Sequence, residues 1–356
     1  MPNFFKDNED LQFYFDEWIE WEPLVRLTER DYADADEGGF SNASEALAFY
    51  REIIEMLGEL VATQIKPYEK EIDAEGVILR DGEVVFPERL AGIFEQIKEL
   101  DLHGLTVPRE LGGMNAPLLL YFLNSELMSR ADVSAMAHHG FHAGMAMAAL
   151  VFSAHEGSSE IDPKTGRFLR TRWPELIEDI VAGRAWGCMD ITEPGAGSDM
   201  AALRTIGEQD ENGNWFVTGE KIFITSGHGK YHFVIARTEE SDPSDPTGGL
   251  AGLSMFLVRA YEEDAQGNRK RIVQISRVEE KLGHHGSATC GLLFDRAPAD
   301  LIGERGDGFK HMLTLMNGAR VGVGFECLGL SESAYRAGLA YATERPSMGK
   351  PIAEHE

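Results

Sequence analysis

The sequence predicts an α+β fold in three successive parts: an N-terminal helical domain, a central β-barrel or β-sandwich domain, and a second helical part. Apolar residues recur at helical spacing up to about residue 154 and again from Gly308. Between them, short runs rich in Val, Ile and Phe are separated by turn residues. Strands and helices do not alternate, which excludes a doubly wound fold. A chain of 356 residues with 43% apolar residues has enough material for a large core.

Residues 1–40 are acidic and aromatic, and we expect them to form an extension that lies on the body of the protein. The first long helix is expected to begin near Asn42, where Glu45 completes a capping box, and to end at Pro67. Its apolar face repeats at spacings of three, four and seven residues: Leu47, Tyr50, Ile54, Leu57, Val61 and Ile65.

Two further stretches complete a helical domain predicted over residues 41–185. One covers residues 86–100, with Pro87 in its first turn. The other covers residues 116–154, which are rich in Ala, Leu and Met and are therefore expected to form buried helices. This part of the chain is predicted to be all-helical.

Residues 186–305 are predicted as the β-domain. Its first strand is expected at GCMDI (187–191), and each of the other predicted strands is bounded by Gly, Asn, Asp or Pro: 215–225, 231–237, 253–260, 271–278 and 288–295. Helical spacing then returns, so residues 306–356 are predicted as the second helical part.

The net charge of −27 excludes partners that need a basic surface. Nucleic acid and anionic membranes are bound by clustered Lys and Arg, so neither is expected as a partner. The first residues lack the basic and apolar regions of a secretory signal. The most apolar stretch, 143–152, is about half the ~20 residues of a membrane span. We expect a cytoplasmic protein with no membrane span.

No metal site is expected from the spacing of Cys and His. The cysteines are too few and too scattered for a disulfide framework or a zinc site: Cys188, Cys290 and Cys327. Structural or hydrogen-bonding roles are predicted for the histidines of a buried-looking helical run and of a later loop: His138, His139, His142, His284 and His285.

The stretch TEPGAGSD (192–199) directly follows the first predicted strand. Gly195 and Gly197 permit backbone angles that a side chain would forbid, and exposed N–H groups in such a loop bind anions. The hydroxyls of Thr192 and Ser198 add donors. The loop can also be a plain turn, and it matches neither the G-x-G-x-x-G fingerprint nor a phosphate-binding P-loop.

A second segment, GEKIFITSG (219–227), has similar chemistry. Phe223 lies in a predicted strand that ends in Thr225 and Ser226. A flat apolar surface beside hydroxyl and backbone donors suits a planar heterocycle with polar edges, such as a flavin. A third segment, EKLGHHGSATC (280–290), is a Gly- and Ser-rich link between strands.

With ITEPGAGSD, KIFITSG, EKLGHHGSAT, GERGDGF, MNGARVGVG and ERPSMGKPI in this order, the chain resembles the acyl-CoA dehydrogenases over residues 45–356. The N-terminal extension resembles the long bacterial branch that includes the 3-methylmercaptopropionyl-CoA dehydrogenases. The resemblance implies that the second helical part is the beginning of a C-terminal helical bundle and that FAD binds between this bundle and the β-domain. It also implies oxidation of an acyl-CoA thioester to the trans-2-enoyl-CoA.

The resemblance assigns FAD contacts to nine residues. Three of them line the flavin ring, two meet FAD and the pantetheine of acyl-CoA, and two pack on or hydrogen-bond the isoalloxazine. The last two reach the FAD diphosphate of a neighbouring subunit, which implies a homodimer or homotetramer. In this order they are Met189, Ile191 and Thr192; Gly197 and Ser198; Phe223 and Thr225; Arg345 and Ser347.

The resemblance also places Asn317 and Arg320 near the CoA thioester arm, with Ser198 as a further substrate contact. The catalytic base of the family is a Glu, and the position before Arg320 that carries it in some branches is Ala319 here. The base is therefore expected beyond residue 356, in a longer protein. Glu326 lies seven residues after Ala319 on the same helix face and is interpreted as a packing residue.

Three alternatives stay open at this point. An electron-transfer flavoprotein is the expected electron acceptor, but an acyl-CoA oxidase of the same fold would use oxygen. A non-catalytic, DNA-associated member of the family is disfavoured by the acidic charge. A flavin-free relative is disfavoured by the intact polar residues Thr192, Ser198, Thr225 and Arg345.

Overall fold

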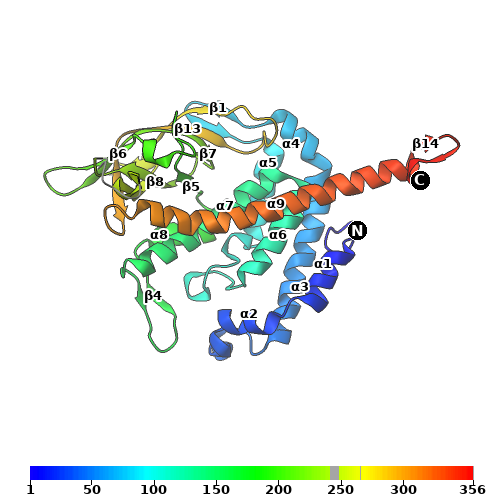
Figure 1. Cartoon of the computed structure of the whole chain (residues 1–356). Coiled ribbons are helices and arrows are strands. Elements are labelled where there is room, and N and C mark those ends of the chain that lie inside the picture. The colour runs from blue at the N-terminus through cyan, green and yellow to red at the C-terminus, as the bar shows by residue number, and fades with distance from the viewer. Residues whose placement is uncertain (241–247, 265, 356) are drawn as a thin grey trace.

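The computed structural model describes residues 1–240, 248–264 and 266–355, and its elements follow the predicted order of helices, sheet and helix (Figure 1). Helices fill the N-terminal part, a β-barrel follows, and the long helix α9 (Gly308–Glu344) crosses both before it projects from the body. The predicted α+β fold is confirmed. Within the described ranges, no helix is both long enough and apolar enough to cross a membrane.

The N-terminal extension folds as short helices against the rest of the chain. α1 (Glu9–Phe13) and α2 (Trp21–Thr28) are separated by a π-helical turn at Tyr14–Trp18. The ring of Trp21 contacts Phe15 within the extension and Tyr50 in the first long helix. Burial of these rings attaches the extension to the helical core.

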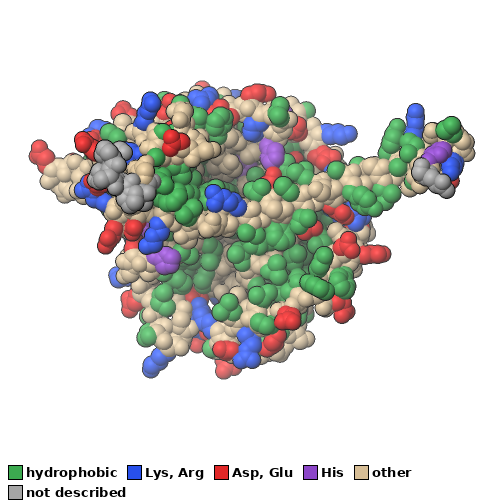
Figure 2. Space-filling model, in the orientation of Figure 1, with side chains coloured by type: hydrophobic (Ala, Val, Ile, Leu, Met, Phe, Trp, Pro, Cys, Tyr) green, Lys and Arg blue, Asp and Glu red, His purple; other side chains and the backbone are tan. Residues whose placement is uncertain are grey.

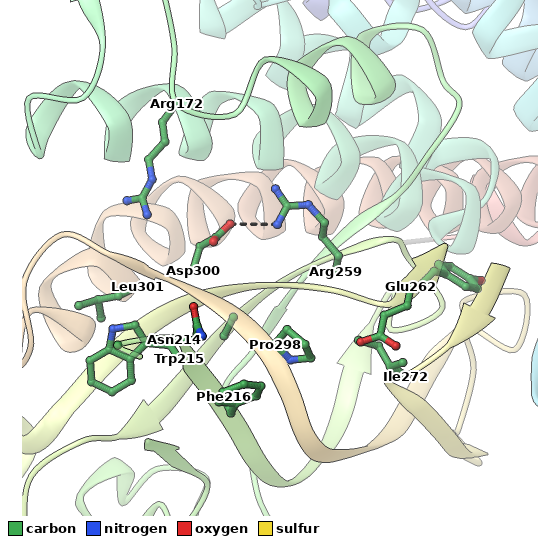
Figure 3. Close-up of a pocket in the computed structure, with 13 residues that line it drawn as sticks. Arg172, Asn214, Trp215, Phe216, Arg259, Glu262, Ile272, Pro298, Asp300 and Leu301 are labelled. Carbon is green, nitrogen blue, oxygen red and sulfur yellow. Dashed lines mark hydrogen bonds and ion pairs between the residues drawn. The ribbon is translucent and has the colours of Figure 1, made fainter. Parts of the chain in front are cut away.

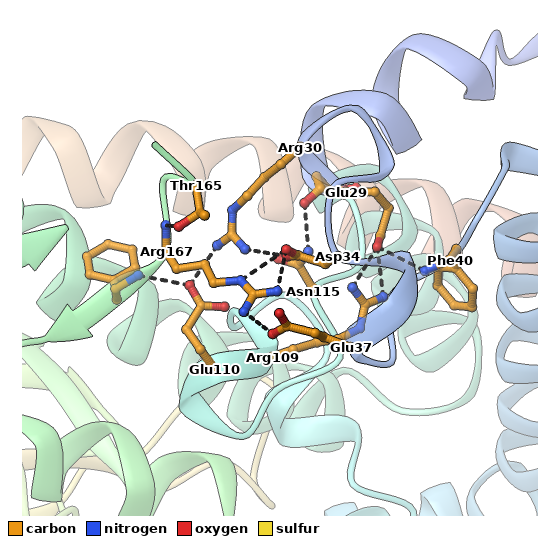
Figure 4. A network of polar contacts seen from close by, with 12 residues as sticks. Glu29, Arg30, Asp34, Glu37, Phe40, Arg109, Glu110, Asn115, Thr165 and Arg167 are labelled. Atoms are coloured by element: carbon orange, nitrogen blue, oxygen red, sulfur yellow. Dashed lines mark hydrogen bonds and ion pairs between the residues drawn. The ribbon is translucent and has the colours of Figure 1, made fainter. Parts of the chain in front are cut away.

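Ion pairs fix the end of this extension (Figure 4). Glu29 is fully buried, and its two carboxylate oxygens accept hydrogen bonds from the terminal nitrogens of Arg109 at 2.6 and 2.7 Å. Arg30 donates to Asp34 at 2.6 Å, and Arg167 from a distant hairpin binds the same carboxylate. Charged residues far apart in the sequence therefore hold the extension in place.

The helical layer contains α3 (Ala43–Leu60), α4 (Glu69–Glu75), α5 (Glu88–Glu99), α6 (Leu118–Ala131), α7 (Val133–His155) and α8 (Pro174–Val181). Asn42 caps α3 as predicted, because its side-chain oxygen accepts from the Glu45 N–H at 2.9 Å. α3 ends before Pro67, but the chain does not leave the helical conformation there: a π-helical turn at Val61–Ile65 and a 3₁₀ turn at Lys66–Tyr68, which contains Pro67, connect α3 to α4. The apolar residues of α6 and α7 are mostly buried, as the sequence predicts.

The prediction that this part is all-helical is wrong at two hairpins. β1 (Ile78–Arg80) pairs with β2 (Glu83–Val85), and β3 (Glu160–Ile161) pairs with β4 (Phe168–Arg170). The first hairpin turns at Asp81 and Gly82, which both have positive φ, at 53° and 80°. Such a two-residue turn suits antiparallel strands, but strands this short have no detectable apolar alternation.

The β-domain is a closed barrel, which decides between the two predicted architectures. Strands pair in the ring β13–β7–β6–β8–β9–β13, with β5 and β12 attached to β8 and β13. Their bounds are Gly187–Asp190 (β5), Ile206–Gln209 (β6), Trp215–Thr225 (β7), Tyr231–Arg237 (β8), Leu253–Arg259 (β9), Gln274–Val278 (β12) and Thr289–Ile302 (β13). β6 and a hairpin of β10 (Tyr261–Glu263) and β11 (Arg269–Arg271) were not predicted, because they are short and polar.

Helix α9 is continuous over 37 residues and packs on α6 and α7. Its far end carries a hairpin of β14 (Pro346–Ser347) and β15 (Lys350–Pro351) outside the body (Figure 1). Apolar side chains gather on the face below α9 and at its projecting end (Figure 2). The exposed ones on α9 are Val321, Val323, Leu328, Leu330, Tyr335, Leu339 and Tyr341.

A glycine allows the close crossing of α9 and α6. A Cβ at Gly329 would lie 2.4 Å from the Glu126 carbonyl oxygen and 2.7 Å from the Arg130 nitrogen, whereas a Cβ at Gly338 would meet no atom within 4 Å. We predict that Gly329→Ala destabilises the protein by about 1–3 kcal/mol because it separates the helices. Gly338→Ala should instead stabilise it by about 0.5–1 kcal/mol. Urea denaturation of both variants checks this, and equal effects would contradict the close crossing.

Candidate functional site

The two segments that carry Thr192 and Thr225 lie side by side. After β5 the chain runs beside β7, and the Ile222 N–H donates to the Thr192 carbonyl at 2.9 Å. Thr225 is the last residue of β7, three positions after Ile222. The structure therefore brings together the two threonines that the sequence analysis singles out.

These segments present hydrogen-bonding groups that are not used elsewhere. Among the described residues, no partner is found for the Thr192 N–H or for the hydroxyls of Thr192, Ser198 and Thr225. Thr192 and Thr225 are half-buried, and Ser198 is exposed. A set of uncommitted donors along two adjacent segments can hydrogen-bond the polar edge of a ligand.

The loop after Thr192 is a tight turn held by backbone bonds. Glu193 and Ala196 exchange two N–H···O bonds of 3.0 Å each. Gly195 has φ 81°, a conformation that favours glycine, and a Cβ at Gly197 would meet only the Thr192 methyl at 3.9 Å. Pro194, Gly195 and Gly197 are exposed, so the outer side of the loop is open to a ligand.

Phe223 interrupts the regular conformation of β7. Its φ is 59°, in the left-handed region that bulky residues rarely adopt. Its ring is 59% exposed, although its neighbours Ile222 and Ile224 are buried. Backbone strain at an exposed aromatic residue beside the two threonines is typical of a functional position.

A buried ion pair lies directly behind these segments. Lys221 is fully buried, and its ammonium group donates to the Glu193 carboxylate at 2.8 Å and to the Ile191 carbonyl at 2.9 Å. Glu193 also accepts from the N–H groups of Arg204 at 2.6 Å and Thr205 at 3.0 Å. Sequence analysis gave Lys221 and Glu193 no role.

The other predicted ring contacts lie on the adjoining core. Met189 is buried and Ile191 is half-buried, and both pack between the barrel and helices α7 and α8. Leu313, Leu315 and Met316 of α9 pack on the same core, which brings the exposed Asn317 and Arg320 into this neighbourhood. Arg320 donates to the Asn317 side-chain oxygen at 3.2 Å.

Arg345 and Ser347 are not brought to this site within one chain. Arg345 follows the last residue of α9 and Ser347 lies in β14, at the projecting end that Figure 1 shows far from the barrel. Both are exposed. Within one chain Arg345 and Ser347 therefore lie far from Thr192 and Thr225.

Glu326 is half-buried on α9 and lies 3.4 Å from the Nε2 atom of His284, measured to its carboxylate oxygen. Burial raises the pKa of Glu326, and the nearby His284 opposes this effect. Through His284, Glu326 contacts a loop of the β-domain, as expected of a residue that packs α9 against that domain. Ala319, one residue before Arg320, carries no group that accepts a proton.

Five histidines form an aromatic cluster behind the site: His103, His138, His139, His142 and His228. Burial lowers the pKa of the first four to about 3 and that of His228 well below its ordinary value. The Ala288 N–H donates to His138 Nε2 at 3.0 Å, so Nδ1 carries the proton and donates to the Ser226 hydroxyl at 2.8 Å. His138 therefore connects the segment of Ser226 to that of Ala288 as a neutral ring.

Three side chains with metal-binding chemistry meet inside the barrel. The Nδ1 atom of His232 lies 2.8 Å from Asp190 Oδ2 and 3.0 Å from Cys188 Sγ, and all three residues are fully buried. These separations are hydrogen-bond lengths, whereas ligand atoms around a tetrahedral zinc are about 3.2–3.7 Å apart. The sequence analysis missed this cluster because it depends on the pairing of β5 with β8.

A groove of about 650 Å³ lies at the opposite end of β7 (Figure 3). Trp215 and Phe216 line it, and so do Arg259 and Asp300, which form an ion pair of 2.9 Å. Because β7 runs from Trp215 to Thr225, the groove and Thr225 lie at opposite ends of this strand. Arg259 is paired with Asp300 and Arg172 with Glu156, and we assign the groove no ligand.

Comparison with protein families finds three matching domains. Residues 49–162, 188–297 and 306–356 match the N-terminal, middle and C-terminal domains of acyl-CoA dehydrogenases. Together these matches cover most of the chain.

Individual relatives agree with these matches. The chain is 30% identical over 316 residues to 3-methylmercaptopropionyl-CoA dehydrogenase of Ruegeria pomeroyi, covering 85% of this chain and 50% of that protein. It is 33% identical over 303 residues to acryloyl-CoA reductase (NADH) of Anaerotignum propionicum, covering 84% and 68%. An acyl-CoA dehydrogenase from Bacillus anthracis, solved in complex with FAD, superposes with a TM-score of 0.66 at 22% identity, covering 86% and 47%.

Proposed function

Because the chain belongs to the acyl-CoA dehydrogenase family, we propose that it binds FAD and takes part in the α,β-dehydrogenation of an acyl-CoA thioester. The observation that carries this proposal is the pair of adjacent segments in which Thr192 and Thr225 have uncommitted donors beside the exposed ring of Phe223. The chain spans half the length of its relative from Ruegeria pomeroyi, so the activity is proposed for the protein that contains this chain.

The donor set fits a flavin. An isoalloxazine has polar atoms along its pyrimidine edge and at N5, and apolar faces. We propose that Thr192 and Thr225 hydrogen-bond these polar positions and that Phe223 packs on a face. Met189 and Ile191 would support the ring from the core, and the open turn at Gly197 and Ser198 would contact both FAD and the pantetheine arm of acyl-CoA.

We propose that Arg345 and Ser347 of one subunit bind the FAD diphosphate of another. A guanidinium donates two parallel hydrogen bonds to a phosphate, and both residues lie on a projecting hairpin. This arrangement requires a homodimer or homotetramer. A contact between subunits agrees with the large separation of Arg345 and Ser347 from Thr192 and Thr225 within one chain.

Bound FAD would supply hydride acceptance from the β-carbon of the thioester. Asn317 and Arg320 would position the thioester arm, since both extend from the part of α9 that packs beside the site. Ala319 cannot accept the α-proton, and Glu326 is engaged with His284. We therefore propose that the general base is a Glu outside this sequence.

FAD titration of the purified chain tests the proposal. We predict saturable binding and, for Thr225→Val, an affinity about tenfold lower, because one hydrogen bond is lost. Thr165→Val, in the remote β3–β4 hairpin, should bind FAD like the wild type. Absence of FAD binding by the wild-type chain would contradict the proposal.

Reoxidation of the flavin, measured on protein that includes the general base, distinguishes the electron acceptors. We propose an electron-transfer flavoprotein. Slow reoxidation of the substrate-reduced flavin in air is then expected in stopped-flow measurements. Fast reoxidation would indicate an acyl-CoA oxidase instead.

A further inference from the structure

We infer that Lys221 is a positioning residue for the flavin: it fixes the Ile191–Thr192 peptide so that the Thr192 N–H points toward the ligand. This inference rests on the proposed function and names a residue that acts through the backbone of another. Three observations support it: the burial of Lys221, the two hydrogen bonds that its ammonium group donates, and the geometry of the Ile191–Thr192 peptide.

Lys221 is held where a lysine is rarely found. Its side chain is fully buried, and Glu193 beside it is only 5% exposed. Burying an ammonium group is costly unless it is paired and hydrogen-bonded. The carboxylate of Glu193 provides the pairing, and the Ile191 carbonyl provides a second acceptor at 2.9 Å.

The orientation of Thr192 follows from this second contact. In a trans peptide the C=O and the N–H point in opposite directions. The Ile191 carbonyl points at the Lys221 ammonium, so the N–H of the same peptide, which belongs to Thr192, points away from the ion pair. That N–H has no partner among the described residues.

The next peptide is fixed as well. The Thr192 carbonyl accepts from the Ile222 N–H, and the Glu193 N–H on its other side donates to the Ala196 carbonyl. Both peptides that flank Thr192 are therefore held from the side of β7. Lys221 and Ile222 are consecutive residues of this strand, so β7 sets the direction of the Thr192 donor as well as presenting Thr225.

Charge pairing with Glu193 does not by itself explain why Lys221 is placed beside the Ile191 carbonyl. Glu193 already accepts two backbone N–H bonds, from Arg204 and Thr205, which fix its carboxylate independently of Lys221. Removing both charges should consequently restore folding stability but not the orientation of the Thr192 N–H.

Three variants test the inference by FAD titration and thermal unfolding of the full chain. Lys221→Met should lower FAD affinity by about 10- to 100-fold, because the freed peptide can rotate its donor away. It should also lower the unfolding temperature, because Glu193 is left buried and unpaired. The double variant Lys221→Met/Glu193→Gln should recover most of the unfolding temperature and still bind FAD weakly. Lys230→Met is the matched control.

Lys230 also donates to two carboxylates, those of Glu175 and Asp179, but it lies directly before β8 and binds α8, not the loop of residues 192–199. Its replacement should leave FAD affinity unchanged. Recovery of FAD affinity together with stability in the double variant would overturn the inference and assign Lys221 a structural role. Failure of the wild-type chain to bind FAD would instead refute the proposed function. If Lys221→Met does not fold, the double variant alone decides, since it contains no unpaired buried charge.

Discussion

Lowering the pH from about 7.5 to about 5.5 should reduce the free energy of unfolding by about 4 kcal/mol. The cause is the buried cluster of His103, His138, His139, His142 and His228. Burial lowers the pKa of the first four to about 3 and the pKa of His228 well below its ordinary value. In the unfolded chain a histidine has a pKa of about 6.5 and takes up a proton over this interval, whereas the buried ring stays neutral.

The sign follows from the depressed pKa of the folded state. The stabilisation is fully present above the unfolded pKa of about 6.5 and is lost progressively as the pH falls toward 3. Each histidine contributes about 1.3 kcal/mol over the two pH units, or about 6 kcal/mol for the five. Glu126 acts in the opposite direction. Burial raises its pKa to about 7, so the folded protein takes up a proton at this residue on acidification, and this uptake offsets about 2 kcal/mol of the lost stability.

Urea denaturation at both pH values measures this loss. His139→Leu is the informative variant, because both ring nitrogens of His139 lack a hydrogen-bond partner in the described chain and its ring is buried. The variant should reduce the pH dependence by about 1.3 kcal/mol. Stability that is unchanged between the two pH values would contradict the assignment of neutral buried rings.

Replacement of Arg109 by Met should destabilise the protein by about 3–5 kcal/mol, because Glu29 would remain fully buried without its ionic partner. The remaining bond to Glu29, from the Phe40 N–H at 3.2 Å, is too weak to compensate for the buried charge. Urea denaturation followed by tryptophan fluorescence measures the effect, since the buried Trp21 reports on the extension.

Two control variants distinguish the buried pair from ordinary charge effects. Arg26→Met removes the partner of Asp31 in the same extension, but both side chains are largely exposed, at 54% and 74%, so no measurable change is expected. The double variant Arg109→Met/Glu29→Gln should regain much of the stability. Equal losses in the Arg26 and Arg109 variants would show that burial of Glu29 is unimportant.

The order of the domains is predictable from the sequence because it depends on local periodicity. The apolar stripe that contains Tyr50 and Ile54 has helical spacing, and the runs at 215–225 and 231–237 are long enough to identify strands. The hairpin at Asp81 and Gly82 was missed, because its strands have three residues each and their pairing depends on the turn.

The candidate site was predictable only in part. Thr192, Thr225 and Phe223 could be found because hydroxyl, aromatic and glycine residues follow short strands in a recognisable order. Lys221 and Glu193 could not, because a lysine in a strand is ordinarily an exposed residue. Their burial becomes evident only when β7 is placed beside the loop that begins 28 residues earlier in the sequence.

If helix α9 tilts as a rigid rod, the tight crossing at Gly329 is its pivot. With a rise of about 1.5 Å per residue, the arm to Arg320 measures about 14 Å and the arm to Arg345 about 24 Å. A tilt of about 5° around the pivot moves the two arms in opposite directions, by about 1 Å and about 2 Å. Any event that rocks this rod therefore displaces Arg320 and Arg345 together, and neither can be adjusted alone.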